Sequence, residues 1–238
     1  SLGVDPISMD DKICSFDCTY CQIGRTKVLT DRRSAFVETN KIIDEIKSLP
    51  ETEIDFITMS GRGEPTLAKN LGEIIREIRR IRKEKIAVIT NSSMLHLEEV
   101  SNDLLLADRV VAKLDAPSQD ILEKINRPIT TITFEKILSS LKAFRKIYHG
   151  ELDLQIMFVE PNKVLTDDLK KISAEIKPDQ IQLNTPLRKC DVTALTANEM
   201  ERIEKVFEGF KTVSVYRAPK KKTISLSDSD TLKRRGKT

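Results

Sequence analysis

The chain has 238 residues and a formal net charge of +3, and 32% of its residues are charged. Charge so close to balance gives no electrostatic reason to expect a nucleic-acid-binding protein, while this length is enough to bury a sizeable core. The sequence has no apolar leader or membrane-spanning stretch, so we expect a cytoplasmic protein.

Short apolar runs alternate with amphipathic segments along the chain, which is typical of repeated β-α units around a parallel sheet. Apolar residues three and four positions apart predict the helices, as at Ile42, Ile43 and Ile46. A further helix is predicted over residues 198–210. Strands are predicted near Ile13 and over residues 55–60, 85–90, 109–114, 152–159, 180–184 and 212–216. This pattern predicts an α/β fold, a partial (β/α)6 TIM-like barrel of parallel strands with helices outside.

The chain divides into one large domain and a short tail. Residues 1–219 carry the β-α pattern and are predicted to form a single domain. Residues 220–238 are rich in Lys, Ser, Asp and Arg and have few large apolar residues. We therefore expect a basic, flexible C-terminal tail, for which a plain solubilising role is favoured over contact with a polyanion.

Three cysteines lie within eight residues, Cys14, Cys18 and Cys21, in the spacing C-x-x-x-C-x-x-C. Three thiolates can hold three corners of a 4Fe-4S cluster, whereas an electron carrier usually supplies four. One iron is therefore expected to stay open for a ligand that is not part of the protein.

Two other interpretations of the three cysteines are less well supported. A structural zinc site usually has four ligands in paired motifs, and Cys190, His96 and His149 have no paired neighbour. A disulfide is disfavoured because an odd group of thiols without a leader indicates a reducing compartment. A lone cysteine such as Cys190 is more often a small packed residue than a ligand.

A second motif follows the predicted strand at residues 55–60, where the sequence reads Gly61-Arg62-Gly63-Glu64-Pro65. Glycine lets the backbone approach a small ligand, proline stiffens the exit, and the carboxylate of Glu64 can accept hydrogen bonds from an ammonium group. Taken alone, this motif is more often an ordinary strand-to-helix turn.

The two motifs in this order resemble the radical S-adenosylmethionine (SAM) superfamily, including the aromatic Tyr20 before the third cysteine. The resemblance implies that a 4Fe-4S cluster and SAM are the cofactors, with Cys14, Cys18 and Cys21 as cluster ligands. It also implies that the cluster, reduced by an external one-electron donor, cleaves SAM to a 5'-deoxyadenosyl radical that abstracts hydrogen from a substrate. The backbone near Tyr20 and the loop residues Gly61, Gly63, Glu64 and Pro65 would then bind SAM.

Polar residues follow the later strands, at the carboxyl ends where parallel β/α folds bind ligands. Thr90-Asn91-Ser92 resembles the Thr-Asn-Gly-like turn of the superfamily, which implies that Asn91 contacts SAM. The resemblance also assigns the ribose hydroxyls to Lys113 or Asp115. Strand-end turns and helix caps use the same residue types, so that alternative stays open. The remaining candidates at this rim are Asn184, Thr185 and Arg188.

Further segments narrow the resemblance to a branch of Fe-S oxidoreductases related to the archaeal wyosine-forming tRNA enzymes. They are residues 1–6, 22–26, 113–116, 125–128 and 183–186. The chain lacks the extra cysteines that the wyosine enzymes use for a second cluster, which puts that reaction in doubt. An RNA base or a small metabolite is the expected substrate. A glycyl-radical activase, a non-catalytic Fe-S carrier and a zinc-stabilised barrel remain as alternatives.

Overall fold

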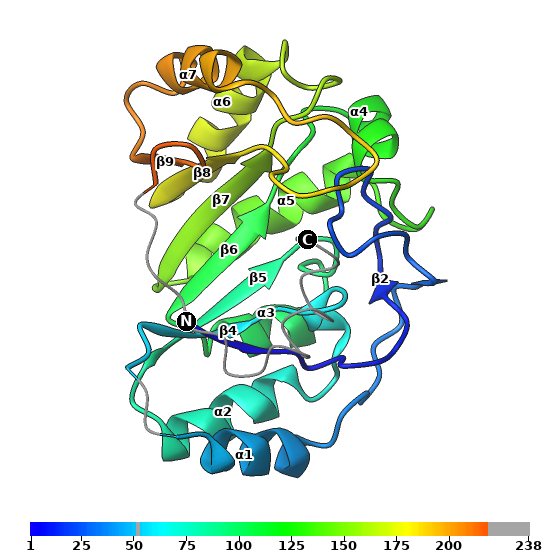
Figure 1. The fold of residues 1–238 in the computed structure, drawn as a ribbon, viewed down its shortest axis with the longest axis vertical. Helices are drawn as coiled ribbons and strands as arrows, with labels where there is room; N and C mark the ends of the chain where they lie inside the picture. The colour runs from blue at the N-terminus through cyan, green and yellow to red at the C-terminus, as the bar shows by residue number, and fades with distance from the viewer. Residues whose placement is uncertain (51–52, 219–238) are drawn as a thin grey trace.

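A computed structural model describes residues 1–50 and 53–218. The centre of the fold is a parallel sheet of seven strands within this described part (Figure 1). The edge strands do not pair with each other, so the sheet stays open and forms a partial barrel. In spatial order the strands are β1 (Leu2–Val4), β4 (Phe56–Met59), β5 (Lys85–Thr90), β6 (Arg109–Lys113), β7 (Glu151–Met157), β8 (Gln180–Asn184) and β9 (Thr212–Ser214).

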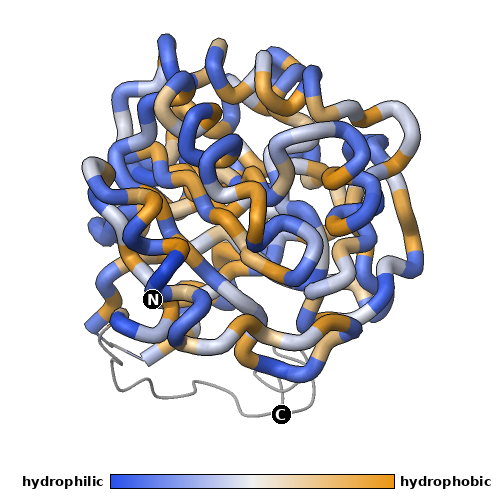
Figure 2. Tube along the Cα trace, turned by 90° about the horizontal axis from the view of Figure 1, so that it is seen from above, coloured by the Kyte–Doolittle hydropathy of each residue, from blue (hydrophilic) through white to orange (hydrophobic). Residues whose placement is uncertain are grey.

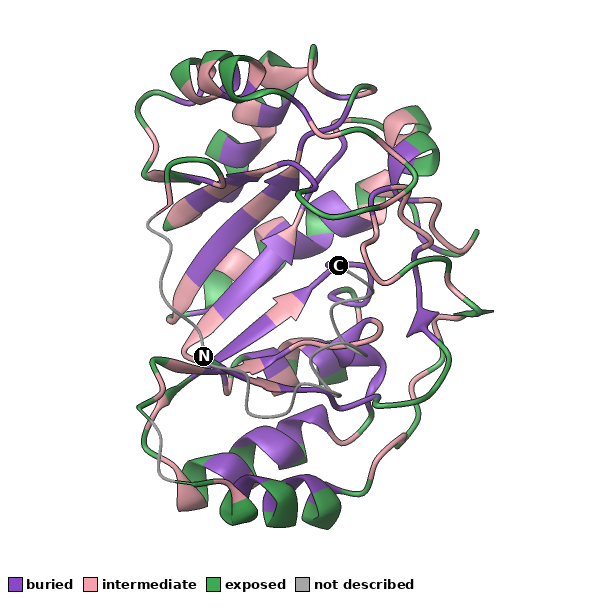
Figure 3. Cartoon of the chain, in the orientation of Figure 1, coloured by how far each residue is buried: buried purple, intermediate pink, exposed green. Residues whose placement is uncertain are grey.

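Helices cover the outer face of the sheet, and several helices that follow one another in the chain also contact one another, as α1 contacts α2 and α6 contacts α7. The outward sides of α1 and α7 are exposed, whereas the strands are buried along much of their length (Figure 3). The helices are α1 (Thr39–Ser48), α2 (Leu71–Ile81), α3 (Glu98–Leu104), α4 (Gln119–Ile125), α5 (Phe134–Ile147), α6 (Thr166–Ile176) and α7 (Ala197–Val206), with a 3-10 helix at Pro65–Leu67.

The two faces of the sheet differ in chemistry because successive side chains of a strand point to opposite sides. Apolar residues such as Val110, Leu154 and Ile181 belong to the hydrophobic core beneath the helices. Hydrophobic and hydrophilic stretches accordingly alternate along the chain (Figure 2). The opposite, inner face of β6, β7 and β8 carries polar side chains, which include Arg109, Lys113, Asp153, Gln155 and Gln182.

The α/β partial-barrel fold class predicted from the sequence is confirmed, but one strand belongs elsewhere. The strand expected near Ile13 is β2 (Ile13–Cys14), which pairs with β3 (Val28–Leu29) in a separate two-stranded sheet. The edge of the main sheet is instead β1, which was not predicted. An isolated bridge between Ile13 and Gly63 holds β2 beside the loop that leaves β4.

The other predicted strands and helices are present with modest shifts at their ends. The helix expected over residues 198–210 runs from Ala197 to Val206, and the last strand ends at Ser214. The predicted tail, residues 220–238, lies outside the described residues. Within the described part, none of the helices combines the length and apolar character needed to cross a membrane.

Candidate functional site

The three clustered cysteines lie on one loop that begins at the end of β2. Cys14 is buried, Cys18 and Cys21 are half-buried, and none of them forms a disulfide. The Cys21 amide donates to the Cys18 carbonyl at 3.1 Å, and the Gly24 amide donates to the Cys21 carbonyl at 3.1 Å. These turns keep the three side chains within one short stretch of loop.

The end of α4 anchors this loop to the barrel. The Asp17 amide donates to the Asn126 carbonyl at 3.0 Å, and the Thr19 amide donates to the Ile125 carbonyl at 2.8 Å. An antiparallel bridge between Phe16 and Pro128 continues the contact. The predicted cysteine loop and residues 125–128 therefore lie side by side, although more than 100 residues separate Asp17 from Asn126.

Burial and neighbouring charges set the protonation of the thiols. Burial raises the pKa of Cys14 to about 12 and that of Cys18 to about 11, so both are neutral thiols without a metal. Iron would bind the thiolates and displace these protons.

A buried cation accompanies the thiols. Lys12 is 6% exposed, and its ammonium donates to the Gly24 carbonyl at 3.0 Å. Burial alone lowers the pKa of Lys12, but the three cysteine sulfurs outweigh it, and the pKa is raised overall. The Cys21 sulfur makes the largest of these contributions. A positive charge therefore sits among the three sulfurs.

Two side-chain amides also point at the sulfurs. Asn91 donates from Nδ2 to the Cys14 sulfur at 3.6 Å, and Asn126 donates from Nδ2 to the Cys18 sulfur at 3.4 Å. No group of three His, Cys, Asp or Glu side chains in the described part of the chain is placed to hold a single metal ion. A cubane cluster binds each thiolate through a different iron, so this donor set fits a 4Fe-4S cluster better than one zinc ion.

The glycines of the Gly-x-Gly-Glu-Pro loop are needed by the chain itself. A Cβ on Gly63 would lie 1.7 Å from the Ile13 carbonyl oxygen, and one on Gly61 would lie 2.0 Å from the Asp5 carboxyl carbon. Asp5 accepts from the amides of Ile7 and Arg62, both at 3.0 Å. The missing side chains therefore let this loop pack against β2 and the segment after β1, and the approach of a ligand to Gly61 and Gly63 stays a prediction.

The Glu64 carboxylate is 2% exposed and fully engaged inside the protein. It accepts from the Thr66 amide at 3.1 Å, the Thr66 hydroxyl at 2.7 Å, the Thr90 hydroxyl at 2.7 Å and the Asn91 amide at 2.6 Å. Burial raises the pKa of Glu64, and these hydrogen bonds oppose that rise. Glu64 thus joins the 3-10 helix that starts at Pro65 to the end of β5, and its predicted contact with a SAM ammonium group is not tested.

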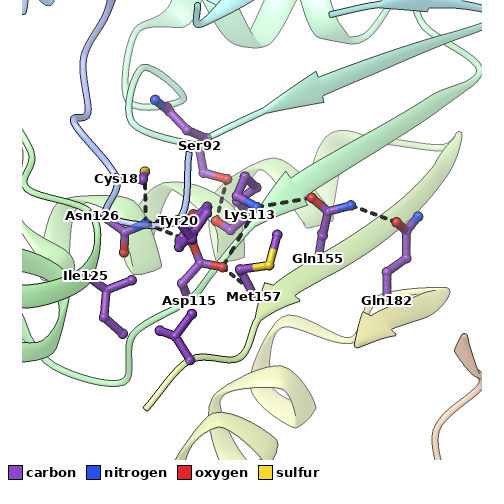
Figure 4. A network of polar contacts seen from close by, with 12 residues as sticks. Cys18, Tyr20, Ser92, Lys113, Asp115, Ile125, Asn126, Gln155, Met157 and Gln182 are labelled. Atoms are coloured by element: carbon purple, nitrogen blue, oxygen red, sulfur yellow. Dashed lines mark hydrogen bonds and ion pairs between the residues drawn. The ribbon is translucent and has the colours of Figure 1, made fainter. Parts of the chain in front are cut away.

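Tyr20 and Asp115 form the centre of a second network (Figure 4). Asp115, which is 3% exposed, accepts from the Tyr20 hydroxyl, from Asn126 Nδ2 at 2.8 Å and from the Met157 amide at 2.8 Å. These bonds tie the cysteine loop to the ends of β6 and β7. Asp115 is therefore occupied by groups of the protein itself, and the contact with the ribose hydroxyls predicted for Lys113 or Asp115 is not tested.

Lys113 continues this network along the inner face of the barrel (Figure 4). Its ammonium lies 5.0 Å from the centre of the Tyr20 ring and donates to Gln155 Oε1 at 3.1 Å. Gln155 donates to Gln182 Oε1 at 2.9 Å, and Gln182 donates to Asp153 Oδ2 at 2.9 Å. A polar row therefore crosses three strands, starting beside the cysteine loop.

The turn after β5 brings Asn91 to the cysteines. Asn91 Nδ2 also donates to the Ser15 hydroxyl at 2.9 Å, and Asn91 Oδ1 accepts from the Ser93 amide at 3.0 Å. Ser92, which stands where the resemblance has glycine, adopts a left-handed φ of 69°. Its hydroxyl donates to the Lys113 carbonyl at 2.9 Å and links this turn to β6.

The candidates Asn184, which ends β8, and Thr185 and Arg188, which follow it, are not part of these networks. The Asn184 carbonyl accepts from the Phe158 amide at 2.7 Å, and the Thr185 hydroxyl accepts from the Leu195 amide at 2.9 Å. Arg188 is exposed. Cys190 and Cys18 both pack against the small cluster of Tyr20, Ile125 and Val159.

Sequence reasoning missed two residues of the site. Asn126 belongs to a segment that carried the family resemblance, but nothing in the sequence indicated that its amide contacts Cys18. Lys12 precedes Cys14 by two positions and gave no signal of its own, because a lysine is usually exposed.

A family model described as the radical SAM superfamily matches residues 12–160. A UPF0026 protein from Synechocystis is 41% identical over 189 residues, which cover 79% of this chain and 71% of that protein. Among solved structures, Streptococcus suis SuiB bound to S-adenosylmethionine has a TM-score of 0.67 at 12% identity, covering 90% of this chain and 51% of that chain. TYW1 with a lysine-pyruvate adduct bound has a TM-score of 0.66 at 16% identity, covering 88% of this chain and 74% of that chain.

Proposed function

The chain belongs to the radical SAM superfamily, and on this premise we propose that it is an enzyme that cleaves SAM reductively to abstract hydrogen from a substrate. The cofactors would be a 4Fe-4S cluster on Cys14, Cys18 and Cys21, and SAM on the iron that lacks a cysteine. When bound, this pair supplies a 5'-deoxyadenosyl radical, which no side chain can generate.

The chain's own residues would position the cofactors. Cys14, Cys18 and Cys21 would hold three irons as thiolates, with side-chain N–H groups close to their sulfurs. Tyr20 and Asp115 fix the loop against the barrel, and this would hold the cluster beside the carboxyl ends of the strands. The backbone of residues 61–65, Asn91 and Lys113 would bind SAM from the neighbouring strand ends. Asn184, Thr185 and Arg188 would lie farther out, where the substrate enters.

The observation that carries the proposal is that the side-chain amides of Asn91 and Asn126 point at the sulfurs of Cys14 and Cys18, while the buried Lys12 ammonium binds the Gly24 carbonyl on the same loop. Buried donors arranged in this way suit thiolates that carry negative charge, because hydrogen bonds and nearby cations stabilise the charged form. Three neutral structural thiols would gain much less from the same donors.

The inner face favours a polar substrate. Lys113, Gln155 and Gln182 present hydrogen-bonding groups beside the cofactor loop. These half-buried groups bond one another, and an RNA base or a small polar metabolite could exchange hydrogen bonds with them, whereas an apolar molecule could not. Deuterium from a labelled RNA or metabolite pool, recovered in 5'-deoxyadenosine, would identify the substrate class.

The test begins with anaerobic reconstitution and measurement of iron and sulfide, which should approach four of each per chain for a complete cluster. With dithionite and SAM, the protein should release methionine and 5'-deoxyadenosine. Cys18→Ala should lose both the cluster and all SAM cleavage, because one of the three irons held by cysteine would lack its thiolate.

Cys190→Ala is the matched control, since Cys190 packs against the same apolar cluster as Cys18. It should keep both the cluster and SAM cleavage. Loss of the cluster in Cys190→Ala would mean a fourth protein ligand and would contradict an open iron. Cleavage by Cys18→Ala at the wild-type rate would contradict the proposal as a whole.

A further inference from the structure

An apolar pair is exposed directly beside the strand that carries Cys14. Val28 and Leu29 of β3 are 43% and 42% exposed, and in the described part of the chain β3 pairs only with β2. Leu29 is in register with Cys14, and the Thr30 amide donates to the Cys14 carbonyl at 3.0 Å. This apolar surface therefore lies on the strand directly next to the one that carries a predicted cluster ligand.

Cations flank the apolar pair. Residues 22–33 contain four basic side chains and one acidic side chain. Arg25 and Arg33 form ion pairs with carboxylates outside this segment, so Lys27 and Arg32 carry its exposed positive charge. Lys27 and Arg32 are exposed, and neither forms an ion pair within the described residues. The exposed Asp10 and Asp11 precede β2 and lie at the end of that strand away from Cys14.

We infer that Lys27, Val28, Leu29 and Arg32, the β3 surface, are the docking site for an acidic one-electron carrier protein that reduces the cluster. The inference rests on the proposed function, because it needs a cluster on Cys14, Cys18 and Cys21. In this step the carrier loses one electron and the cluster gains it. No bond forms or breaks.

The composition of the surface suits a transient redox partner. A small apolar centre gives contact area, and a charged rim steers an oppositely charged protein and raises its association rate. Redox encounters bury little surface, so a patch of this size is sufficient. The position also fits, because Cys14 itself is buried and its partner in the two-stranded sheet, Leu29, is exposed.

The test measures electron transfer from reduced flavodoxin, an acidic flavoprotein, by stopped-flow absorbance of its semiquinone. One electron leaves the flavin hydroquinone anion to give the neutral semiquinone, so no proton moves. With the reconstituted wild-type protein, the rate should fall as salt rises because added ions screen the attraction.

The variant Lys27→Glu with Arg32→Glu should slow this transfer at low salt by about tenfold or more and remove its salt dependence. Leu29→Ser should slow it while the salt dependence stays. Both variants should be reduced by dithionite as fast as the wild type, because a small reductant needs no docking surface. They should also bind oxidised flavodoxin more weakly.

Lys83→Glu with Lys146→Glu is the matched control, since both lysines are exposed and lie near the amino-terminal ends of β5 and β7. It makes the same charge change and should leave the transfer rate unchanged. Electron transfer at the wild-type rate in Lys27→Glu with Arg32→Glu would overturn the docking site. A wild-type dimer that Leu29→Ser dissociates would also overturn it, because the β3 surface would then be a contact between two copies of this chain. Neither result would overturn the proposed function. Failure of dithionite to reduce the wild-type cluster would overturn the proposed function as well.

Discussion

Asn126 connects the cysteine loop to the barrel through one amide group that reaches both Cys18 and Asp115. Its Nδ2 lies 3.4 Å from the Cys18 sulfur and 2.8 Å from Asp115 Oδ2, with the Tyr20 hydroxyl at 3.0 Å. The residue itself is buried at the end of α4. A change at Asn126 should therefore alter the geometry of the loop and the electron density at the Cys18 sulfur.

Asn126→Leu should lower the reduction potential of the cluster and reduce the stability of the protein. Loss of an N–H donor to a thiolate disfavours the more negative, reduced cluster. Asp115 Oδ2 keeps the Tyr20 hydroxyl but loses the Asn126 donor, which should lower the free energy of unfolding by about 1–3 kcal/mol. Redox titration followed by EPR and denaturant unfolding measure the two effects.

Asn70→Leu is a control for this prediction. Asn70 Nδ2 donates to the Val37 carbonyl and the Thr39 hydroxyl, away from the cysteines. The Asn70→Leu variant should lose stability, but the reduction potential of its cluster should not shift. An unchanged potential in Asn126→Leu would mean that its amide does not contact the cluster sulfur.

Lys12→Met should shift the reduction potential further in the negative direction than Asn126→Leu does. Methionine keeps much of the buried volume of Lys12 but removes a full positive charge beside the three sulfurs. A charge acts more strongly than a neutral donor in a buried site, and reduction adds one negative charge to the cluster. EPR-monitored titration checks the order of the two shifts, and a potential equal to that of the wild type would contradict it.

Glu64→Gln should lower the free energy of unfolding by about 1–3 kcal/mol, although it preserves the shape of the side chain. All four donors that reach Glu64 come from the protein, so the NH2 group of glutamine must face an N–H or O–H group. Denaturant unfolding measures this loss. Glu73→Gln, at an exposed position on α2, should change stability by less than about 0.5 kcal/mol.

The sequence predicts the elements of this fold and the cysteine ligands better than it predicts what surrounds them. Periodic apolar residues locate the main strands and helices, because each element must bury one face. β1 was missed because three residues, Leu2–Val4, are too short to show a period. The contact of Asn126 with the Cys18 sulfur depends on the approach of a segment more than 100 residues away, and the burial of Lys12 depends on how the loop folds. No local pattern encodes either of them.

Glu64 illustrates the same limit within a predicted motif. The motif identifies a carboxylate after a strand, but its availability for a ligand depends on Thr90 at the end of the next strand and on Asn91 in the turn that follows. The sequence indicated that these residues belong to one rim. It did not indicate that the protein itself provides all the donors that Glu64 has in the structure.

Gly63→Ala should prevent cluster assembly by displacing β2. The new Cβ would lie 1.7 Å from the Ile13 carbonyl oxygen, which is a backbone atom that cannot rotate away. That oxygen accepts from the Glu64 amide at 3.2 Å, so separating the two segments breaks the bond that holds the Cys14 strand beside the loop. We expect less than one tenth of the wild-type iron content after reconstitution, together with a stability loss of several kcal/mol, on the order of that for severe overpacking.

Gly209→Ala separates this clash from the general effect of replacing a glycine. Gly209 has a φ of 99° and no heavy atom within 4 Å of a built Cβ, so alanine there should cost only the backbone strain of about 1–2 kcal/mol. Its iron content should match that of the wild type. Full iron loading of Gly63→Ala would show that the contact between the glycine loop and β2 is not required to place Cys14, because the strand would then hold its position without it.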